Sequence, residues 1–189
     1  MKYDPNIHHR RTIRLKDYDY TQPGAYFVTL VTSQRLCLFG EIAAGIMHLN
    51  LLGRTVMNNW LNLPSFFPIR LDAFVVMPNH FHGIIWIDGE RTGEASAGAR
   101  TSSSHSPAAD ASPQPPKGTQ PNSLGAIIQN FKSITTRRSN QIQSSPGLRL
   151  WQRNYYEHII RDEAELARIE AYIQANPSRW EEDREFFRP

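Results

Sequence analysis

From Ile69 to Ile87 the sequence is an almost continuous run of strand-forming residues, "IRLDAFVVMPNHFHGIIWI", interrupted only around Pro78 and Asn79. Proline and asparagine between two such runs favour a turn, so the run predicts two extended segments in succession. The second segment carries His80 and His82 among apolar neighbours. Because burial of an imidazole costs free energy unless a polar group receives it, this pair requires a structural or chemical reason.

The segments before this run predict a strand, a hairpin and a helix. Residues 25–32, "AYFVTLVT", are β-branched and aromatic, and residues 35–50 form short strand-like pieces broken by glycine. Asn50 can cap a helix over residues 51–63, in which apolar residues recur at helical spacing before Pro64.

The carboxyl-terminal third predicts two helices with an extended segment between them. Asn122 or Ser123 can cap the first helix, and residues 148–160 have an extended pattern. Asp162 can begin the second helix, which Pro177 ends.

The chain has 189 residues, which suffices for one sizeable hydrophobic core and is short for two full domains. Residues 89–122 are small, polar and proline-rich, which predicts a disordered insertion. The insertion is longer than a simple loop requires. It separates residues 1–88 from residues 123–189, which we expect to form one domain. Helices alternating with antiparallel strands predict an α+β fold, in which helices pack on a sheet.

The composition points to a chain of the cytoplasm that has no disulfide. Cys37 is the single cysteine, and no stretch approaches the roughly 18 unbroken apolar residues of a membrane span. Residues 1–16 are polar and basic and have no signal-peptide core. We therefore expect a cytoplasmic protein with no membrane partner.

The basic residues are clustered, although the formal net charge is only +3. Cations interleaved with aromatic rings suit a nucleic-acid backbone with unstacked bases, and solvated charges over core aromatics are an equally good interpretation of the same pattern. Three groups of basic residues are candidates for DNA binding. The amino-terminal arm contributes Arg10, Arg11 and Arg14, and a basic helix face contributes Lys132, Arg137 and Arg138. Arg153 lies beside the aromatic residues Trp151, Tyr155 and Tyr156.

Side chains of a strand alternate between faces, so His80 and His82 point the same way and can converge on one ion, while Phe81 and Gly83 point the other way. Imidazole ligands favour transition ions such as Mn²⁺, whereas Mg²⁺ prefers oxygen. The His-X-His spacing taken alone is better explained by two histidines hydrogen-bonded to backbone or acidic groups.

The histidine segment and two further motifs together change this interpretation. The segments "MPNHFHGII", "LWQRNYYEHIIRDEAEL" and "IEAYIQANP" occur in this order. Together they resemble the REP-associated tyrosine transposases, which belong to the superfamily of single-tyrosine HUH transposases with an IS200-like domain. The resemblance covers most of the chain outside residues 89–122 and implies a ferredoxin-like antiparallel sheet with the histidine strand central.

The resemblance also implies a set of site residues. His80 and His82 would hold a divalent cation, Mg²⁺ or Mn²⁺, with Asn176 as a third ligand. Tyr172 would attack a phosphodiester of single-stranded DNA. Residues four apart on a helix are neighbours, so Tyr172 and Asn176 can approach one ion together. The alternatives are a half-buried tyrosine with a bonded hydroxyl and an asparagine that ends a helix.

Tyr155 and Tyr156 are rival nucleophiles, but the resemblance places the nucleophile at Tyr172 and leaves the pair to packing or base stacking. A metal-bound histidine needs a hydrogen-bond acceptor on its other nitrogen. Glu157, His158 and Asp72 are equivalent candidates for that role.

The implied activity is cleavage and rejoining of single-stranded DNA at repetitive palindromic hairpins through a 5′-phosphotyrosine, without a nucleotide cofactor. One alternative is a hairpin nucleic-acid-binding protein without catalysis. Another is a metal-dependent phosphodiesterase that uses water. A monomer and a homodimer are both compatible with the sequence.

Overall fold

The computed structural model describes residues 18–88 and 119–182. The basic arm with Arg10, Arg11 and Arg14 lies outside these residues, as does most of the expected insertion. The element order is β1 (Gly24–Val31), β2 (Gly40–Ala43), β3 (Ile46–Leu49), α2 (Leu51–Leu61), β4 (Ile69–Val76), β5 (His80–Ile87), α3 (Leu124–Ile142), β6 (Tyr156–Ile160) and α4 (Glu163–Ala175), with short 3₁₀ helices at η1 (Ser33–Arg35), η2 (Leu63–Ser65) and η3 (Pro177–Glu182).

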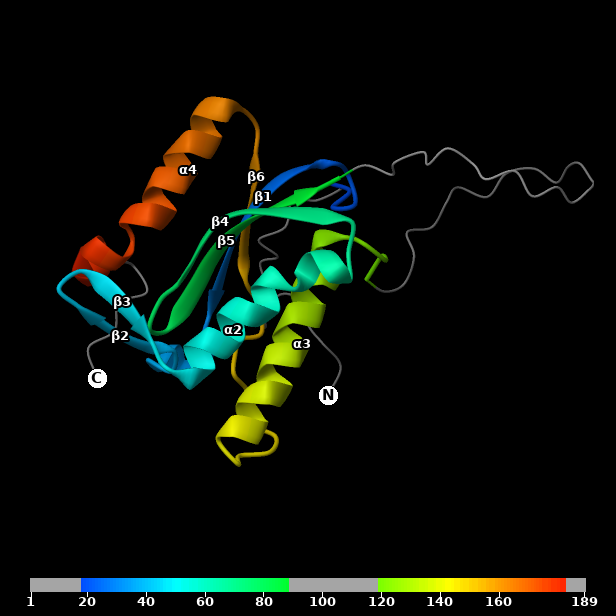
Figure 1. The fold of residues 1–189 in the computed structure, drawn as a ribbon. Helices are drawn as coiled ribbons and strands as arrows, with labels where there is room; N and C mark the ends of the chain where they lie inside the picture. The colour runs from blue at the N-terminus through cyan, green and yellow to red at the C-terminus, as the bar shows by residue number, and fades with distance from the viewer. Residues whose placement is uncertain (1–17, 89–118, 183–189) are drawn as a thin grey trace, which may run out of the picture.

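The main sheet has the strand order β4-β5-β1-β6, and each neighbouring pair is antiparallel. The histidine strand β5 is therefore central, as expected. Strands from both sides of residues 89–118 pair in this one sheet. The α+β class and the antiparallel sheet with helices packed on it are confirmed (Figure 1).

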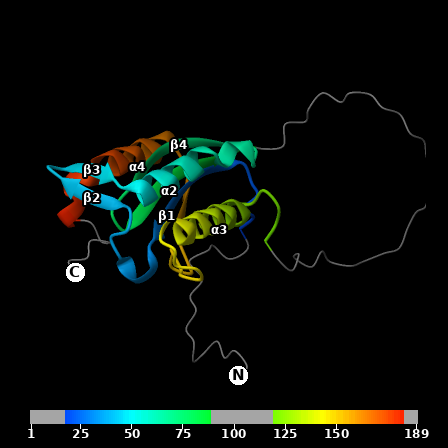
Figure 2. The ribbon, with the colours of Figure 1, turned by 60° about the horizontal axis from the view of Figure 1, so that its bottom comes forward.

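The helices cover opposite faces of the sheet. Helices α2 and α3 pack on one face, and α4 lies across the other (Figures 1 and 2). The hairpin of β2 and β3 lies beside α2 and η3. No helix within the described ranges is long and apolar enough to cross a membrane.

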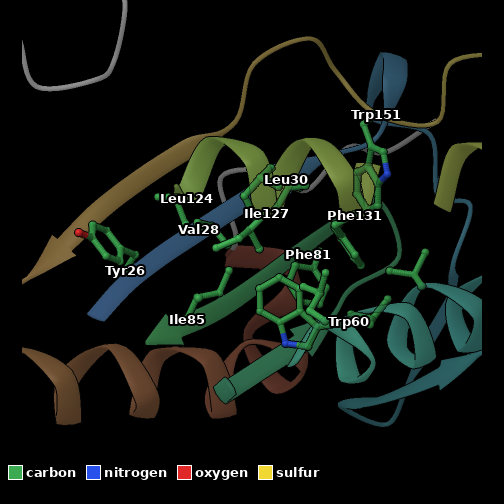
Figure 3. Packing of buried hydrophobic residues seen from close by; sticks show 14 of the residues in the cluster. Tyr26, Val28, Leu30, Trp60, Phe81, Ile85, Leu124, Ile127, Phe131 and Trp151 are labelled. Carbon is green, nitrogen blue, oxygen red and sulfur yellow. The ribbon is translucent and has the colours of Figure 1, made fainter. Parts of the chain in front are cut away.

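The larger core fills the space between the sheet and helices α2 and α3. Trp60 from α2, Phe81 from β5 and Phe131 from α3 meet there with ring centroids 4.5 to 5.6 Å apart (Figure 3). Gly83 leaves room for the Trp60 ring, because a Cβ atom at Gly83 would lie 2.5 Å from Trp60 Cζ2. Phe81 and Gly83 thus face α2 and α3, and the two histidines face α4.

Each long helix begins at a residue whose side chain accepts a backbone N–H. Asn50 caps α2 and accepts from Gly53 at 2.9 Å. Ser123 caps α3, and Asp162 caps α4 by accepting from Glu165 at 2.8 Å. Such caps satisfy N–H groups that have no partner within the helix, which explains why the starts were predictable.

The extended segment expected over residues 148–160 is a regular strand only from Tyr156 onward. Trp151 before it forms a single bridge with Thr32 and is buried against Phe39 and Phe131. Its indole N–H donates to Thr135 Oγ1 at 2.8 Å. The Gln152 N–H still donates to the carbonyl oxygen of Val31, but the regular ladder with β1 begins only at Tyr156, so the strand prediction was too long.

Candidate active site

The two histidines occupy the face of β5 that α4 covers. Their ring centroids are 4.5 Å apart, and both side chains are buried. The register pairs His82 with Thr29 on β1 and with Val75 on β4, so the pair lies in the middle of the sheet. The expectation that both rings point the same way agrees with this arrangement.

The Nδ1 atom of each histidine is engaged by a neighbouring side chain. His80 Nδ1 lies 2.9 Å from Asn79 Oδ1, and the amide of Asn79 is oriented by donation from its Nδ2 to the carbonyl oxygen of Arg35. Because an amide oxygen only accepts, this contact places a proton on His80 Nδ1, and a neutral His80 ring then has its lone pair on Nε2. His82 Nδ1 lies 2.8 Å from Thr29 Oγ1, which can accept in the same way.

Helix α4 brings Tyr172 to the second histidine. The Tyr172 hydroxyl lies 3.2 Å from His82 Nε2, although the two residues are 90 positions apart in the sequence. Phe27 on β1 stacks on His82 with centroids 5.4 Å apart and meets the edge of Tyr172 at 6.3 Å. The phenol is therefore held between an apolar ring and an imidazole, while 44% of Tyr172 stays exposed.

Asn176 lies one turn beyond Tyr172, at the carboxyl end of α4, and is buried. Trp180 in the following η3 lies 5.7 Å from the ring of His80, centroid to centroid. Segment 172–180 thus contacts His82 at its start and His80 at its end. Asn176 lies in the middle of this segment, and its role as a third ligand stays a prediction.

The donor set fits a divalent cation. Burial and the neighbouring His80 hold the pKa of His82 well below its usual range, so the ring is neutral and keeps a lone pair. Two imidazole nitrogens and an amide oxygen suit an ion of the Mn²⁺ type and leave coordination positions open. In the described part of the chain no cluster of three or more His, Cys, Asp or Glu residues could hold a metal. The mixed set of His80, His82 and Asn176 stays a prediction.

Asp72 and His158, two of the three residues expected to orient the histidines, have other partners. Asp72 accepts the indole N–H of Trp86 at 2.9 Å. His158 Nε2 lies 2.8 Å from Glu165 Oε1. The Arg161 backbone N–H and His158 lower the pKa of Glu165, so this contact joins β6 to the first turn of α4.

Sequence reasoning missed Thr29, Asn79, Phe27 and Trp180, all of which contact the histidines. Asn79 precedes His80 directly and was considered only as a turn residue. Thr29 and Phe27 could have been found from the strand "AYFVTLVT" only if its pairing register with β5 had been known.

Three of the expected DNA-binding residues line a groove on the other face of the sheet. The groove measures about 680 Å³ and lies beside α3, where its wall includes Lys132, Arg137, Arg153 and Tyr155. Lys132 Nζ donates to the carbonyl oxygens of Gln152 and Arg153, and burial lowers its pKa to about 8. Arg138 is exposed on the same helix but is not part of this wall.

The aromatic residues near these cations are not equivalent. Trp151 is a core residue, and Tyr155 packs against the same core while being half-buried. Tyr156 is exposed on the face that carries the histidines. Of the two interpretations of this cationic and aromatic cluster, the core interpretation holds for Trp151.

No protein-family model matches the chain. An uncharacterized protein of Haemophilus influenzae (strain ATCC 51907 / DSM 11121 / KW20 / Rd) is 44% identical over 183 residues, which cover 96% of each chain. Among solved structures, a REP-associated tyrosine transposase bound to a REP hairpin superimposes with a TM-score of 0.55 at 18% identity, covering 88% of this chain and 74% of that chain. The chain therefore belongs to one protein family with the Haemophilus influenzae protein, and its fold is that of the REP-associated tyrosine transposases, as the sequence motifs predicted.

Proposed function

We propose that the protein is a single-tyrosine transposase that cleaves and rejoins single-stranded DNA at palindromic hairpins. The observation that carries the proposal is the 3.2 Å approach of the Tyr172 hydroxyl to His82 Nε2. The partly exposed phenol contacts the buried ring of His82, whose centroid lies 4.5 Å from that of His80, and this contact supports Tyr172 as the nucleophile beside two candidate metal ligands. Such a pairing suits phosphoryl transfer to a side chain.

In this proposal His80, His82 and Asn176 hold a divalent cation, Mg²⁺ or Mn²⁺. The cation would supply charge stabilisation to the phosphodiester as a Lewis acid. A cation held by His82 would use the lone pair of Nε2, the atom that the Tyr172 hydroxyl approaches at 3.2 Å, so Tyr172 would have to leave this nitrogen. Thr29 and Asn79 then keep the two Nδ1–H groups bonded and both rings in place.

Tyr172 Oη attacks the phosphorus atom, an O–P bond to tyrosine forms, and the bond from phosphorus to the 3′-oxygen breaks. The phenol loses one proton and the leaving 3′-oxygen gains one. The products are a 5′-phosphotyrosine and a free 3′-hydroxyl, which can reverse the reaction on the same or another strand. Because the bond energy is retained, rejoining needs no nucleotide cofactor.

The groove beside α3 is the proposed contact surface for DNA phosphates. Arg137 and Arg153 line it and are exposed, and Lys132 supplies a third cation. The groove and the histidines lie on opposite faces of the sheet, and the edge strand β6 separates them. A DNA strand that reaches both must pass this edge.

The test mixes the full-length chain with labelled hairpin DNA from a pool with randomised single-stranded flanks, in Mn²⁺ or Mg²⁺, and resolves products under denaturing conditions. We expect a protein–DNA adduct that requires the metal and is absent from Tyr172→Phe. Tyr156→Phe is the matched control, because Tyr156 is 45% exposed and contacts the same Phe27 ring as Tyr172.

Two outcomes would replace this proposal. Cleavage without an adduct that persists in Tyr172→Phe would establish a water-dependent phosphodiesterase. Binding that ignores metal, with neither cleavage nor adduct, would establish a hairpin-binding protein.

A further inference from the structure

The two tyrosines at the start of β6 point to opposite faces of the sheet. Tyr155 packs toward the core under α3 and lines the basic groove. Tyr156 pairs with Thr29 across β1, and its ring meets the edge of Phe27 at 6.3 Å. The period-two alternation of a strand thus assigns one tyrosine to the groove and the other to the face of the histidines.

Tyr156 lies in the same row of the sheet as the candidate metal site. Thr29 on β1 pairs with Tyr156 on one side and with His82 on the other. Phe27 contacts both Tyr156 and Tyr172, each at 6.3 Å between centroids. Two exposed phenol rings therefore flank one nearly buried phenyl ring beside His82.

The ring of Tyr156 is accessible from the outside of the sheet. Strand β6 is an edge of the main sheet in the described part of the chain, and 45% of Tyr156 is exposed. Large aromatic side chains with this degree of exposure in the described ranges are Phe66, Tyr156 and Tyr172. Phe66 precedes β4 near Ile69, which pairs with the far end of β5, so it lies away from His80.

We propose that Tyr156 is a stacking platform for an unpaired base that flanks the phosphodiester attacked by Tyr172. This inference rests on the proposed function and adds a positioning residue to it. An exposed aromatic ring binds single-stranded DNA through the π-face of a base, without reading its sequence. Stacking at Tyr156 would fix the strand where it turns around the β6 edge toward Tyr172.

The test measures DNA binding rather than cleavage, in a Tyr172→Phe background that preserves the DNA. The DNA is the hairpin selected by the chain from the randomised pool, labelled with fluorescein, and a second set replaces each flanking nucleotide in turn by an abasic residue. Fluorescence anisotropy gives Kd for Tyr156→Ala, for Tyr156→Phe and for Phe66→Ala as the matched exposed aromatic control.

We expect Tyr156→Ala to weaken binding about 5- to 150-fold, the range found for loss of one base–aromatic stack. Tyr156→Phe and Phe66→Ala should bind as the parent does. At one flanking position, the abasic residue should weaken DNA binding by the parent to the level of Tyr156→Ala on intact DNA. The same abasic DNA should bind Tyr156→Ala no more weakly than intact DNA does. Thermal melting should show equal folding of all variants.

Equal Kd values for Tyr156→Ala and the parent on every DNA would overturn the stacking role. The proposed function would not be affected by this result, because the Tyr172 adduct assay tests it separately. The stacking role would also be overturned if Tyr156→Ala weakened binding by the same factor on intact DNA and on every abasic DNA. In that case no single base would be the partner of Tyr156. Failure of the parent to bind any hairpin in the pool would contradict the proposed function and the inference with it.

Discussion

Replacement of Thr29 by valine tests whether the strand next to the histidines controls metal binding. Valine has nearly the volume and the β propensity of threonine, so β1 and its packing should persist. What disappears is the acceptor 2.8 Å from His82 Nδ1, in a place where Thr29 is 8% and His82 3% exposed. Water cannot readily substitute there.

The loss has two parts. A buried N–H without an acceptor costs about 1–3 kcal/mol. If His82 avoids that cost by moving the proton to Nε2, it loses the lone pair that would bind the ion. Removal of such an orienting partner typically lowers metal affinity about 10- to 100-fold, or about 1.4–2.7 kcal/mol.

The assay is calorimetric titration of Mn²⁺ into the full-length chain without DNA. Thr29→Val should bind 10- to 100-fold more weakly than the parent, whereas Thr29→Ser keeps a hydroxyl and should stay close to it. An unchanged Mn²⁺ affinity in folded Thr29→Val would refute the role of Thr29. If His82→Ala also bound Mn²⁺ as the parent does, the ion would not be held at this site.

Two further predictions concern the groove and the core. Because the pKa of Lys132 lies at about 8, its charge is largely lost by pH 9, and DNA affinity at low salt should fall between pH 7 and 9 by at most about tenfold per pH unit. Lys132→Arg stays charged and should remove this pH-dependent fall in affinity. If the fall persists in Lys132→Arg, a group other than Lys132 titrates. Gly83→Ala forces a Cβ atom to within 2.5 Å of Trp60 Cζ2 and should destabilise the chain by about 1–3 kcal/mol in denaturant unfolding. A smaller penalty is expected in a Trp60→Phe background, and an unchanged unfolding midpoint in Gly83→Ala would show that the core yields without cost.

Features that depend on neighbours in the sequence were predictable. The helix starts at Asn50, Ser123 and Asp162 follow from side chains that bond to N–H groups three residues later. The shared face of His80 and His82 follows from strand alternation. These interactions are local, so no knowledge of the tertiary structure was needed.

Features that depend on strand register were not predictable. Thr29 meets His82 across 53 positions of sequence, and this pairing is set by how β1 and β5 align. A shift of one residue would have turned Phe27 and Thr29 to the opposite face. Burial of Trp151 likewise depends on Phe39 and Phe131, which converge on it only in the folded chain.

The sheet separates the parts of the candidate site more sharply than the sequence implied. "NYYEH" reads as one aromatic and polar cluster, yet the structure divides it between a basic groove and the face of the histidines. Duplex DNA is stiff over short lengths, so the proposed path around β6 suits a strand that is single and flexible. If DNA binds as proposed, the part that reaches Tyr172 is therefore an unpaired flank rather than a duplex stem.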